Sequence, residues 1–351
     1  MRAITFSSSI NAWSLHTACQ RLGVRLFTTE RARTFPLPFC GDLDSSQEDT
    51  RLLFTEEESL GRHIGNPKLR FYPPHFPRAL LDDKLAFAEW LTSFGEKPVP
   101  TLPAPDAYPV LLKLRHSWRG HKLPRGWVCR GPGDWARAQV AAKEAGVAPS
   151  WLMVQPWYGD DCEVISVCGF FDARQPARNT MCVVRRLADQ HERPACSAMV
   201  ATVHDPAALV DRTNQILQRL DFAGPFELEF LGVRGAYDVL ELNPRFWMQH
   251  ALFTEAGNGL VKRCLDLDQP ADWSAPPPSK LLWVDGVWLL IRLLRLDSAP
   301  LRTMDTWIHQ RGYALVVAPP LPMALGLLLR KRWQKLAGRL WPTRHKAVPP
   351  C

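Results

Sequence analysis

The stretch FELEFLGVRGAYDVLELNPRFW, residues 226–247, places Glu229, Glu241 and Asn243 among apolar residues of strand type. Its two halves read as strands, and the GVRG between them is a turn sequence that favours a hairpin. Side chains alternate along a strand, so Glu229 and Glu241 share a face if the connecting loop has an odd number of residues. The sequence then predicts two neighbouring carboxylates, with Asn243 two residues farther on.

These three side chains favour a particular chemistry. Two carboxylates held close together repel each other unless a proton or a cation lies between them. With an amide oxygen they form a set of hard ligands, which suits Mg²⁺ or Mn²⁺ and does not suit a soft metal. The alternative is that they are solvated residues on an open sheet face.

Composition indicates a globular protein. The chain has 351 residues, of which 46% are hydrophobic and 22% charged, so two or three subdomains can each bury a core. The start, MRAITFSSSINAW, has no apolar run of signal-peptide length, so secretion is not expected. Nine cysteines occur without a C-x-x-C pair, and this predicts reduced thiols without disulfides.

The basic character of the chain is confined to its end. The formal net charge is +8, and eight Lys or Arg but no Asp or Glu follow Thr306. The first 305 residues are therefore neutral in sum, with 35 basic and 35 acidic residues. A nucleic-acid groove in the body of the protein is not expected.

The N-terminal part reads as short alternating elements. RAITF and VRLFT are strands that flank a helix with serines at its start and Gly23 past its end. RLLFTEEESLGRHIG reads as a strand and a helix, and LRFYPP, residues 69–74, as a further strand. These elements predict a small parallel sheet. Proline-rich EKPVPTLPAPDAYP, residues 96–109, then marks a boundary.

Beyond this boundary the expected elements are longer. VLLKLR, SWLMVQPW and EVISVCGFFDA read as strands, and an alanine-rich helix begins at Asp134 and ends at Gly146. A second helix begins at Asp205 and Pro206, where a capping residue precedes proline, and runs through Leu220.

The run ELEF…DVLELNPRFW resembles the metal-binding hairpin of the ATP-grasp superfamily, with Glu229 and Glu241 twelve residues apart and Asn243 and Arg245 following. Other segments resemble that superfamily in the right order: DDKLAFAEWL, YPVLLKL, WLMVQPWYGDD, VVRRLADQHERPA and EAGNGLVKRCLDL. The resemblance covers roughly residues 80–268. Among subfamilies the chain is most similar to uncharacterised carboxylate–amine ligases related to D-aspartate ligase.

The resemblance implies an α/β protein of ATP-grasp fold, with an α+β core whose sheet is antiparallel. Residues 1–79 would form a small N-terminal parallel α/β domain. Residues 80–270 would form the ATP-grasp domain, with a lid at about 101–158. Residues 271–351 would be a C-terminal extension with a basic amphipathic tail.

The resemblance also implies roles for particular residues. Lys84 and Lys113 would contact the ATP phosphates, and Arg245 would steady the transferring phosphoryl group. The hairpin residues Glu229, Glu241 and Asn243 would hold Mg²⁺ or Mn²⁺ through their side-chain oxygens. Adenine would be read by backbone groups from Val154 through Gln155 and Pro156 to Trp157, and the ribose by Asp160, Asp161 or Glu163. Arg185 or Arg186 would clamp a carboxylate substrate, or else both are solvated strand residues.

The implied activity is an ADP-forming ligase that activates a carboxylate with ATP and joins it to an amine. Two departures keep alternatives open. The lid loop RHSWRGHKLPRG has only two glycines, and Pro156 stands where the superfamily commonly has an acidic residue. The alternatives are a nucleotide-binding protein with weak catalysis and an enzyme with a non-amine acceptor.

The tail combines an apolar run with basic residues. YALVVAPPLPMALGLLLRKRWQKLAGRLW is interrupted by prolines, and residues 313–329 are too short for a comfortable membrane span. A helix from Pro322 to Trp341 is expected to pack on the body or a partner, or to lie on an anionic membrane surface. We expect a cytoplasmic protein, with residues 323–351 as a contact to a protein or to the inner membrane face.

Overall fold

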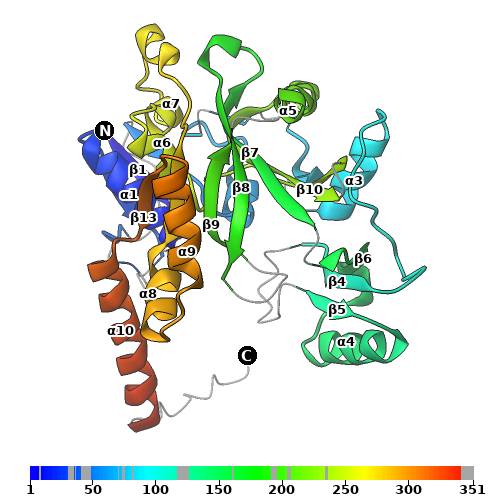
Figure 1. Ribbon diagram of the computed structural model, residues 1–351. Helices are drawn as coiled ribbons and strands as arrows, with labels where there is room; N and C mark the ends of the chain where they lie inside the picture. Colours follow the sequence, from blue (N-terminus) through cyan, green and yellow to red (C-terminus); the bar gives the residue numbers. More distant parts are fainter. Residues whose placement is uncertain are drawn as a thin grey trace, which may run out of the picture.

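The computed structural model describes residues 1–7, 9–30, 35, 37–40, 49–69, 71–72, 76–80, 83–116, 126–159, 162–190, 196–203, 207–233 and 236–340, without the side chains of Arg78, Val233 and 331–340. Within these residues the strands form three sheets, as Figure 1 shows. A parallel sheet lies at the N-terminus, a seven-stranded sheet forms the centre, and a small sheet stands apart from both.

The N-terminal sheet contains β1 (Arg2–Thr5), β2 (Arg25–Thr28) and β3 (Thr50–Leu52), with β2 and β3 both parallel to β1. Its helices are α1 (Ile10–Arg21), capped by the Ser9 side chain, and α2 (Glu57–His63). The predicted parallel sheet is thus confirmed. The strand predicted over 69–74 is wrong in its described part. Tyr72 has a φ of 66°, and its hydroxyl donates to the carbonyl of Pro244 at 2.6 Å.

Five antiparallel strands form the larger part of the seven-stranded sheet: β7 (Glu163–Asp172), β8 (Thr180–Asp189), β9 (Ser197–Val203), β10 (Ala223–Val233) and β11 (Ala236–Asn243). Helix α5 (Ala207–Arg219) packs on β7 and buries Leu209, Ile216 and Leu217. After β11 come the short helices α6 (Ala251–Glu255) and α7 (Leu260–Cys264), which contact α1. One continuous apolar core therefore joins the N-terminal and central sheets.

The C-terminal extension completes this sheet. Strand β12 (Leu281–Asp285) pairs antiparallel with β9, and β13 (Ala314–Ala318) pairs parallel with β12. Burial of Leu282, Trp283 and Val284 fixes β12 in the interior. Helices α8 (Gly286–Leu294) and α9 (Ala299–Asp305) lie between β12 and β13 in the chain, and helix α10 (Leu321–Leu340) follows β13. The sheet therefore crosses the predicted boundary between residues 270 and 271.

The small sheet contains β4 (Val110–Leu114), β5 (Trp127–Cys129) and β6 (Leu152–Pro156) in the order β5-β4-β6. Helix α4 (Pro132–Glu144) covers one face and forms a separate core with Val110, Leu112 and Val154. Because side chains alternate, Lys113 and Gln155 lie on the other face. In Figure 1 α4 lies on the side of the small sheet that is farther from the seven-stranded sheet.

A short segment connects α3 (Lys84–Thr92) with the small sheet. At one end the N–H of Val239 in β11 donates to the carbonyl of Lys97 at 2.8 Å, and the N–H of Val99 donates to the carbonyl of Val239 at 2.8 Å. At the other end Leu102 and Val154 exchange two backbone hydrogen bonds of 2.9 and 3.0 Å. The connection is therefore attached to the edge strand of each sheet.

Candidate functional site

The β10–β11 hairpin places the predicted carboxylates opposite each other. Glu229 pairs with Glu241, and Glu227 pairs with Asn243. Directly paired residues in an antiparallel ladder project from the same face, so these four side chains gather on one face of the sheet. The fifth member of the group, Arg245, follows two residues after β11.

A β-bulge produces this register. Val233 pairs with Ala236, so the connecting loop has two residues rather than the odd number that a regular ladder would require. The register shifts between Glu229 and Phe230, where β11 contains one extra residue, Leu240. Bulges re-aim side chains in this way and are frequent beside functional sites.

Asn243 connects the carboxylates to Arg245. Its Nδ2 donates to Glu227 Oε2 at 3.2 Å and to Glu229 Oε1 at 3.1 Å, and its Oδ1 accepts from Arg245 Nη2 at 3.1 Å. Glu227, Glu229 and Asn243 are all buried. The amide orientation is therefore fixed at three points, because each polar atom of a buried amide has a partner.

Arg245 also reaches helix α2 in the N-terminal part of the chain. Its Nε donates to Glu57 Oε1 at 2.6 Å, at the first residue of α2. Burial alone would lower the pKa of Arg245, but the charges of Glu57, Glu227 and Glu241 raise it. Glu57 was not predicted as a site residue, although it lies in an acidic helix start, TEEES, directly after a strand.

Only one of the two predicted arginines joins this group. Arg186 Nη2 donates to Glu229 Oε2 at 3.1 Å, and its Nη1 donates to Asp189 Oδ1 at 3.4 Å. Arg185 projects from the opposite face, because consecutive strand residues alternate, and forms an ion pair of 2.7 Å with Glu163. The structure therefore does not bring Arg185, or Glu163 as a ribose ligand, to the face of the carboxylates.

Lys84 approaches the group from α3. Its Nζ lies 3.7 Å from Glu241 Oε2. The preceding residue, Asp83, caps α3 by accepting from the N–H groups of Leu85 and Ala86 at 3.2 and 3.1 Å. The cap fixes where the helix begins, so it fixes where Lys84 projects.

Asp83 also binds the small sheet. It accepts from Arg115 Nε at 2.5 Å and from Arg115 Nη2 at 2.6 Å, a bidentate pair at the end of β4. Burial would raise the pKa of Asp83, but the hydrogen bonds from Arg115 and the Ala86 N–H lower it. Asp83 and Arg115 thus connect Lys84 with the strand that carries Lys113, which is 8% exposed.

The predicted adenine-binding strand is β6. Gln155 is buried, and its Nε2 donates to Thr101 Oγ1 at 3.1 Å. The Val154 N–H donates to Leu102, and the Trp157 N–H donates to the carbonyl of Pro109 at 3.0 Å. Both donors are thus used within the fold, and alternation directs the Pro156 carbonyl away from β4.

After this strand the chain turns at Gly159, which has a φ of 68°. Asp160 and Asp161 lie outside the described residues, as does the lid loop between His116 and Gly126.

Electrostatics at the hairpin favour a cation. The pKa of Glu227 is raised to about 8, first by burial and then by the Glu229 carboxylate, and Arg245 and Arg186 offset only part of this. In the part of the chain that the structure describes, no three or more His, Cys, Asp or Glu side chains are placed to hold a metal by themselves. Mg²⁺ usually takes one or two protein carboxylates and completes its shell with phosphates and water. The pair Glu229 and Glu241 fits that mode. Asn243 would join it only after turning its Oδ1 from Arg245 to the pair, because its Nδ2 faces Glu229 here.

Other polar residues near the hairpin have structural roles. His250 is fully buried, its Nδ1 lies 2.6 Å from the Trp247 carbonyl, and burial lowers its pKa to about 4. Asn258 bonds to Thr180 and Arg263. All cysteines among the described residues are free thiols, as expected.

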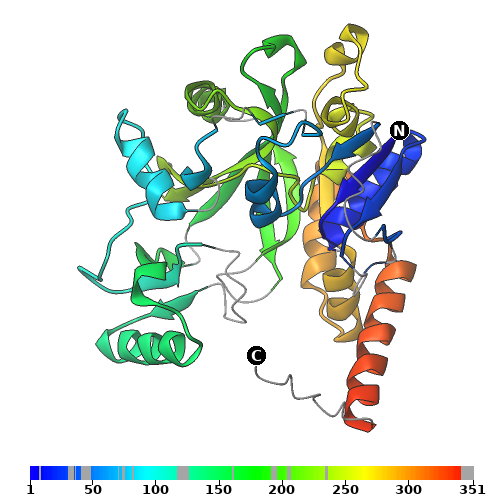
Figure 2. The ribbon, with the colours of Figure 1, turned by 180° about the vertical axis from the view of Figure 1, so that it is seen from behind.

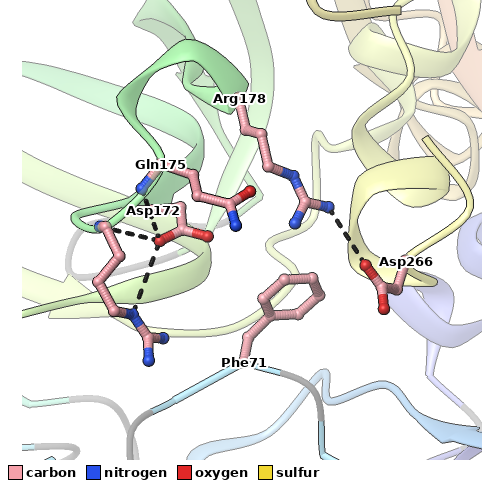
Figure 3. A pocket seen from close by; sticks show the side chains of 6 residues that line it. Phe71, Asp172, Gln175, Arg178 and Asp266 are labelled. Atoms are coloured by element: carbon pink, nitrogen blue, oxygen red, sulfur yellow. Dashed lines mark hydrogen bonds and ion pairs between the residues drawn. The ribbon is translucent and has the colours of Figure 1, made fainter. Parts of the chain in front are cut away.

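A separate cavity of about 280 Å³ lies between the turn after β7 and the end of α7 (Figure 3). Arg178 Nη2 lies 3.8 Å from Asp266 Oδ1, and Arg174 Nε lies 3.9 Å from Asp172 Oδ1. Its charged groups therefore pair with one another, and the cavity is distinct from the hairpin.

Neither the family models nor the curated proteins contain a match to this chain. Solved structures do match. N5-carboxyaminoimidazole synthetase from Staphylococcus aureus, complexed with ADP, has a TM-score of 0.59 and 14% identity over 85% of this chain and 86% of that one. L-amino acid ligase from Bacillus licheniformis has a TM-score of 0.55 and 10% identity over 79% and 77%.

A third similar structure is the biotin carboxylase domain of Hydrogenobacter thermophilus 2-oxoglutarate carboxylase, with MgADP and bicarbonate. Its TM-score is 0.55, with 13% identity over 76% of this chain and 69% of that one. All three proteins are ATP-grasp enzymes. The similarity covers between 76% and 85% of this chain, and this chain therefore has the ATP-grasp fold.

Proposed function

We propose that the chain is an ATP-dependent ligase that phosphorylates a carboxylate and joins the resulting acyl phosphate to an amine. The products are an amide, ADP and phosphate. One observation carries the proposal: Glu229, Asn243 and Arg245 form a continuous hydrogen-bonded group, with Glu241 opposite Glu229 and Lys84 3.7 Å from Glu241.

The group combines the two kinds of charge that phosphoryl transfer requires. The two glutamates, with the amide oxygen of Asn243 turned toward them, would hold Mg²⁺, which would supply positive charge to offset the charge that develops on the phosphates. Lys84, and Lys113 on the face of the small sheet that α4 leaves uncovered, would attract the phosphates as compact cations. Asp83 and Arg115 would keep Lys84 and the strand of Lys113 in register.

The arginines would have separate tasks. Arg245 is held by Glu57 and Asn243, so its guanidinium is oriented before a phosphoryl group arrives. Arg186 is the better candidate for an anionic substrate, because it lies on the face of the carboxylates whereas Arg185 does not. The relation to D-aspartate ligase remains a prediction from the sequence.

A second candidate is an ATP-grasp enzyme with a non-amine acceptor. The biotin carboxylase domain that this chain resembles was solved with bicarbonate, and bicarbonate is activated by the same phosphoryl chemistry. The hairpin, lysines and arginines would keep their roles, and only the acceptor would differ.

The test is ADP formation from ATP and Mg²⁺ with pools of carboxylates and amines, followed by mass spectrometry for products of condensation. ADP that depends on both pools supports the ligase. ADP that requires bicarbonate and no amine supports the second candidate. Tight ATP binding without ADP from any pool would contradict both and indicate a nucleotide-binding protein.

The glutamine variant of Glu241 identifies contaminating ATPase, because it should abolish ADP formation by this chain. A matched control is Glu255→Gln, which removes an exposed carboxylate paired with Arg21 away from the hairpin.

A further inference from the structure

In its first half, residues 321–330, helix α10 packs on the protein through one side. Ala324 and Leu327 are buried, at 0% and 9% exposure, and α10 contacts α8. Figures 1 and 2 both show the distal half of α10 extending away from the sheets. The expected packing on the body is therefore confirmed for the inner side of the first half.

The outward side of α10 is apolar. Leu321, Leu325 and Leu329 are 37%, 45% and 55% exposed. At 100° per residue these three positions span an arc of about 80°, whose centre lies about 130° around the helix from the mean direction of Ala324 and Leu327. We call Leu321, Leu325 and Leu329 the outer stripe of α10.

Charge identifies the kind of partner that fits the outer stripe. The helix contains Arg330, Lys331, Arg332, Lys335 and Arg339 and no acidic residue. A second copy seated on the stripe would bring these cations together, and like charges oppose such a contact. An anionic lipid surface satisfies both features, since leucine side chains enter the acyl boundary while Lys and Arg reach the headgroups.

No helix that the structure describes is long and apolar enough to pass through a bilayer. An amphipathic helix of this composition instead lies in the plane of the interface. We propose that α10 docks the protein on the surface of an anionic lipid bilayer through its outer stripe. The inner side remains packed on α8, so docking requires no unfolding of the body.

The proposal is tested by flotation of the full chain with vesicles of pure phosphatidylcholine and with vesicles containing about one-third phosphatidylglycerol. The wild-type chain should float with the anionic vesicles and stay below the neutral ones. Raising the salt from about 0.1 to 1 M should release it, because the Debye length falls from about 10 to 3 Å.

Two variants separate the stripe from the charges. Leu325→Asp combined with Leu329→Asp should lower binding at least tenfold, because two apolar contacts are replaced by anions. Neutralising Arg330, Lys331 and Arg332 to Gln should lower binding on the order of 100-fold, since each cation near the surface contributes about fivefold. The matched control is Val140→Asp, which adds an anion at an exposed apolar position of α4, 55% exposed, and should float like wild type.

Three results would overturn the proposal. The first is no flotation of the wild-type chain with anionic vesicles. The second is equal flotation with neutral vesicles. The third is a dimer in analytical ultracentrifugation that the paired leucine variant dissociates while vesicle binding is absent, which would assign the stripe to a second copy. Nucleotide affinity of all variants should match wild type, and this measurement confirms that each variant is folded.

Discussion

Replacing Asp83 with Asn tests how the site is assembled across two sheets. Asn caps helices about as well as Asp, so the hydrogen bonds to Leu85 and Ala86 should survive. The change removes the negative charge and turns one acceptor of the bidentate Arg115 pair into a donor. The variant therefore isolates the link between α3 and β4.

The structure sets the expected magnitude. Hydrogen bonds to charged groups contribute about 1.5–3 kcal/mol, and exposed ion pairs about 0–1 kcal/mol. The Asp83 and Arg115 side chains are 13% and 29% exposed, so the pair lies between these limits, at about 1–2 kcal/mol. If the link positions Lys84 and Lys113 for phosphates, ATP affinity should fall roughly five- to thirtyfold.

The pKa of Asp83 defines the pH range in which this effect should be seen. The folded pKa of Asp83 is below its ordinary value of 3.8, so its stabilising effect is complete above that value and is lost as the pH falls through the folded pKa. At pH 7 the full effect should therefore be visible. ATP affinity by isothermal titration calorimetry and the melting temperature are the two measurements.

The control is Asp134→Asn. Asp134 also lies in the first turn of a helix, accepts from the Arg130 N–H at 2.8 Å and pairs with Arg137 at 2.5 Å, but it lies on the far side of the small sheet. The Asp134→Asn substitution should leave ATP affinity unchanged. Equal ATP affinity of wild type and the Asp83 variant, with both folded, would refute the reasoning.

Glu241→Gln should lower ADP formation by orders of magnitude with an unchanged melting temperature, and retained activity would remove Glu241 from the metal site. Lys113→Met should weaken ATP binding about tenfold because a buried cation is lost, whereas Lys143→Met on exposed α4 should not; equal titration curves would contradict this role. Leu327→Ala should lower the free energy of unfolding by about 1–3 kcal/mol and Leu325→Ala by less than about 0.5 kcal/mol, measured in urea. The His250 pKa of about 4 predicts that up to about 3 kcal/mol of stability is lost as the pH falls from 6.5 to 4, because the unfolded chain binds the proton first. Glu227 shifts stability in the opposite direction, so the measurement is the difference in pH slope between wild type and His250→Asn, and identical slopes would contradict the assignment.

Local patterns in the sequence predicted much of the fold. Ser9 before α1, Gly23 after it and the apolar runs of β1 and β2 are short-range signals, and the parallel sheet follows from them. The hairpin was likewise visible from residues 226–243. Its register was not, because nothing in the sequence says whether an odd residue lies in the turn or in a bulge such as that at Leu240.

Contacts between distant segments explain what the sequence missed. Asp83 binds Arg115 and Glu57 binds Arg245, partners 32 and 188 residues apart, and each reads locally as an ordinary helix-start acid. Tyr72 has strand-type neighbours, but its hydroxyl bonds to Pro244 and its backbone turns there. Arg185 and Arg186 are adjacent residues of the same type, so the sequence does not say which of them lies near the carboxylates. The paired strands show that Arg186 lies on the face of the carboxylates and Arg185 on the opposite face.

The segment 97–102 is hydrogen-bonded to both sheets, and this limits how the small sheet can move. Val99 is hydrogen-bonded to the seven-stranded sheet and Leu102 to the small sheet, so only Pro100 and Thr101 lie between the two attachments. Proline holds φ near −65°, and the Thr101 hydroxyl donates to the Val99 carbonyl at 3.1 Å. Any rotation of one sheet against the other therefore has to change the few backbone torsions that remain free in these two residues. The connection is a stiff hinge, and it limits the directions in which the small sheet can rotate.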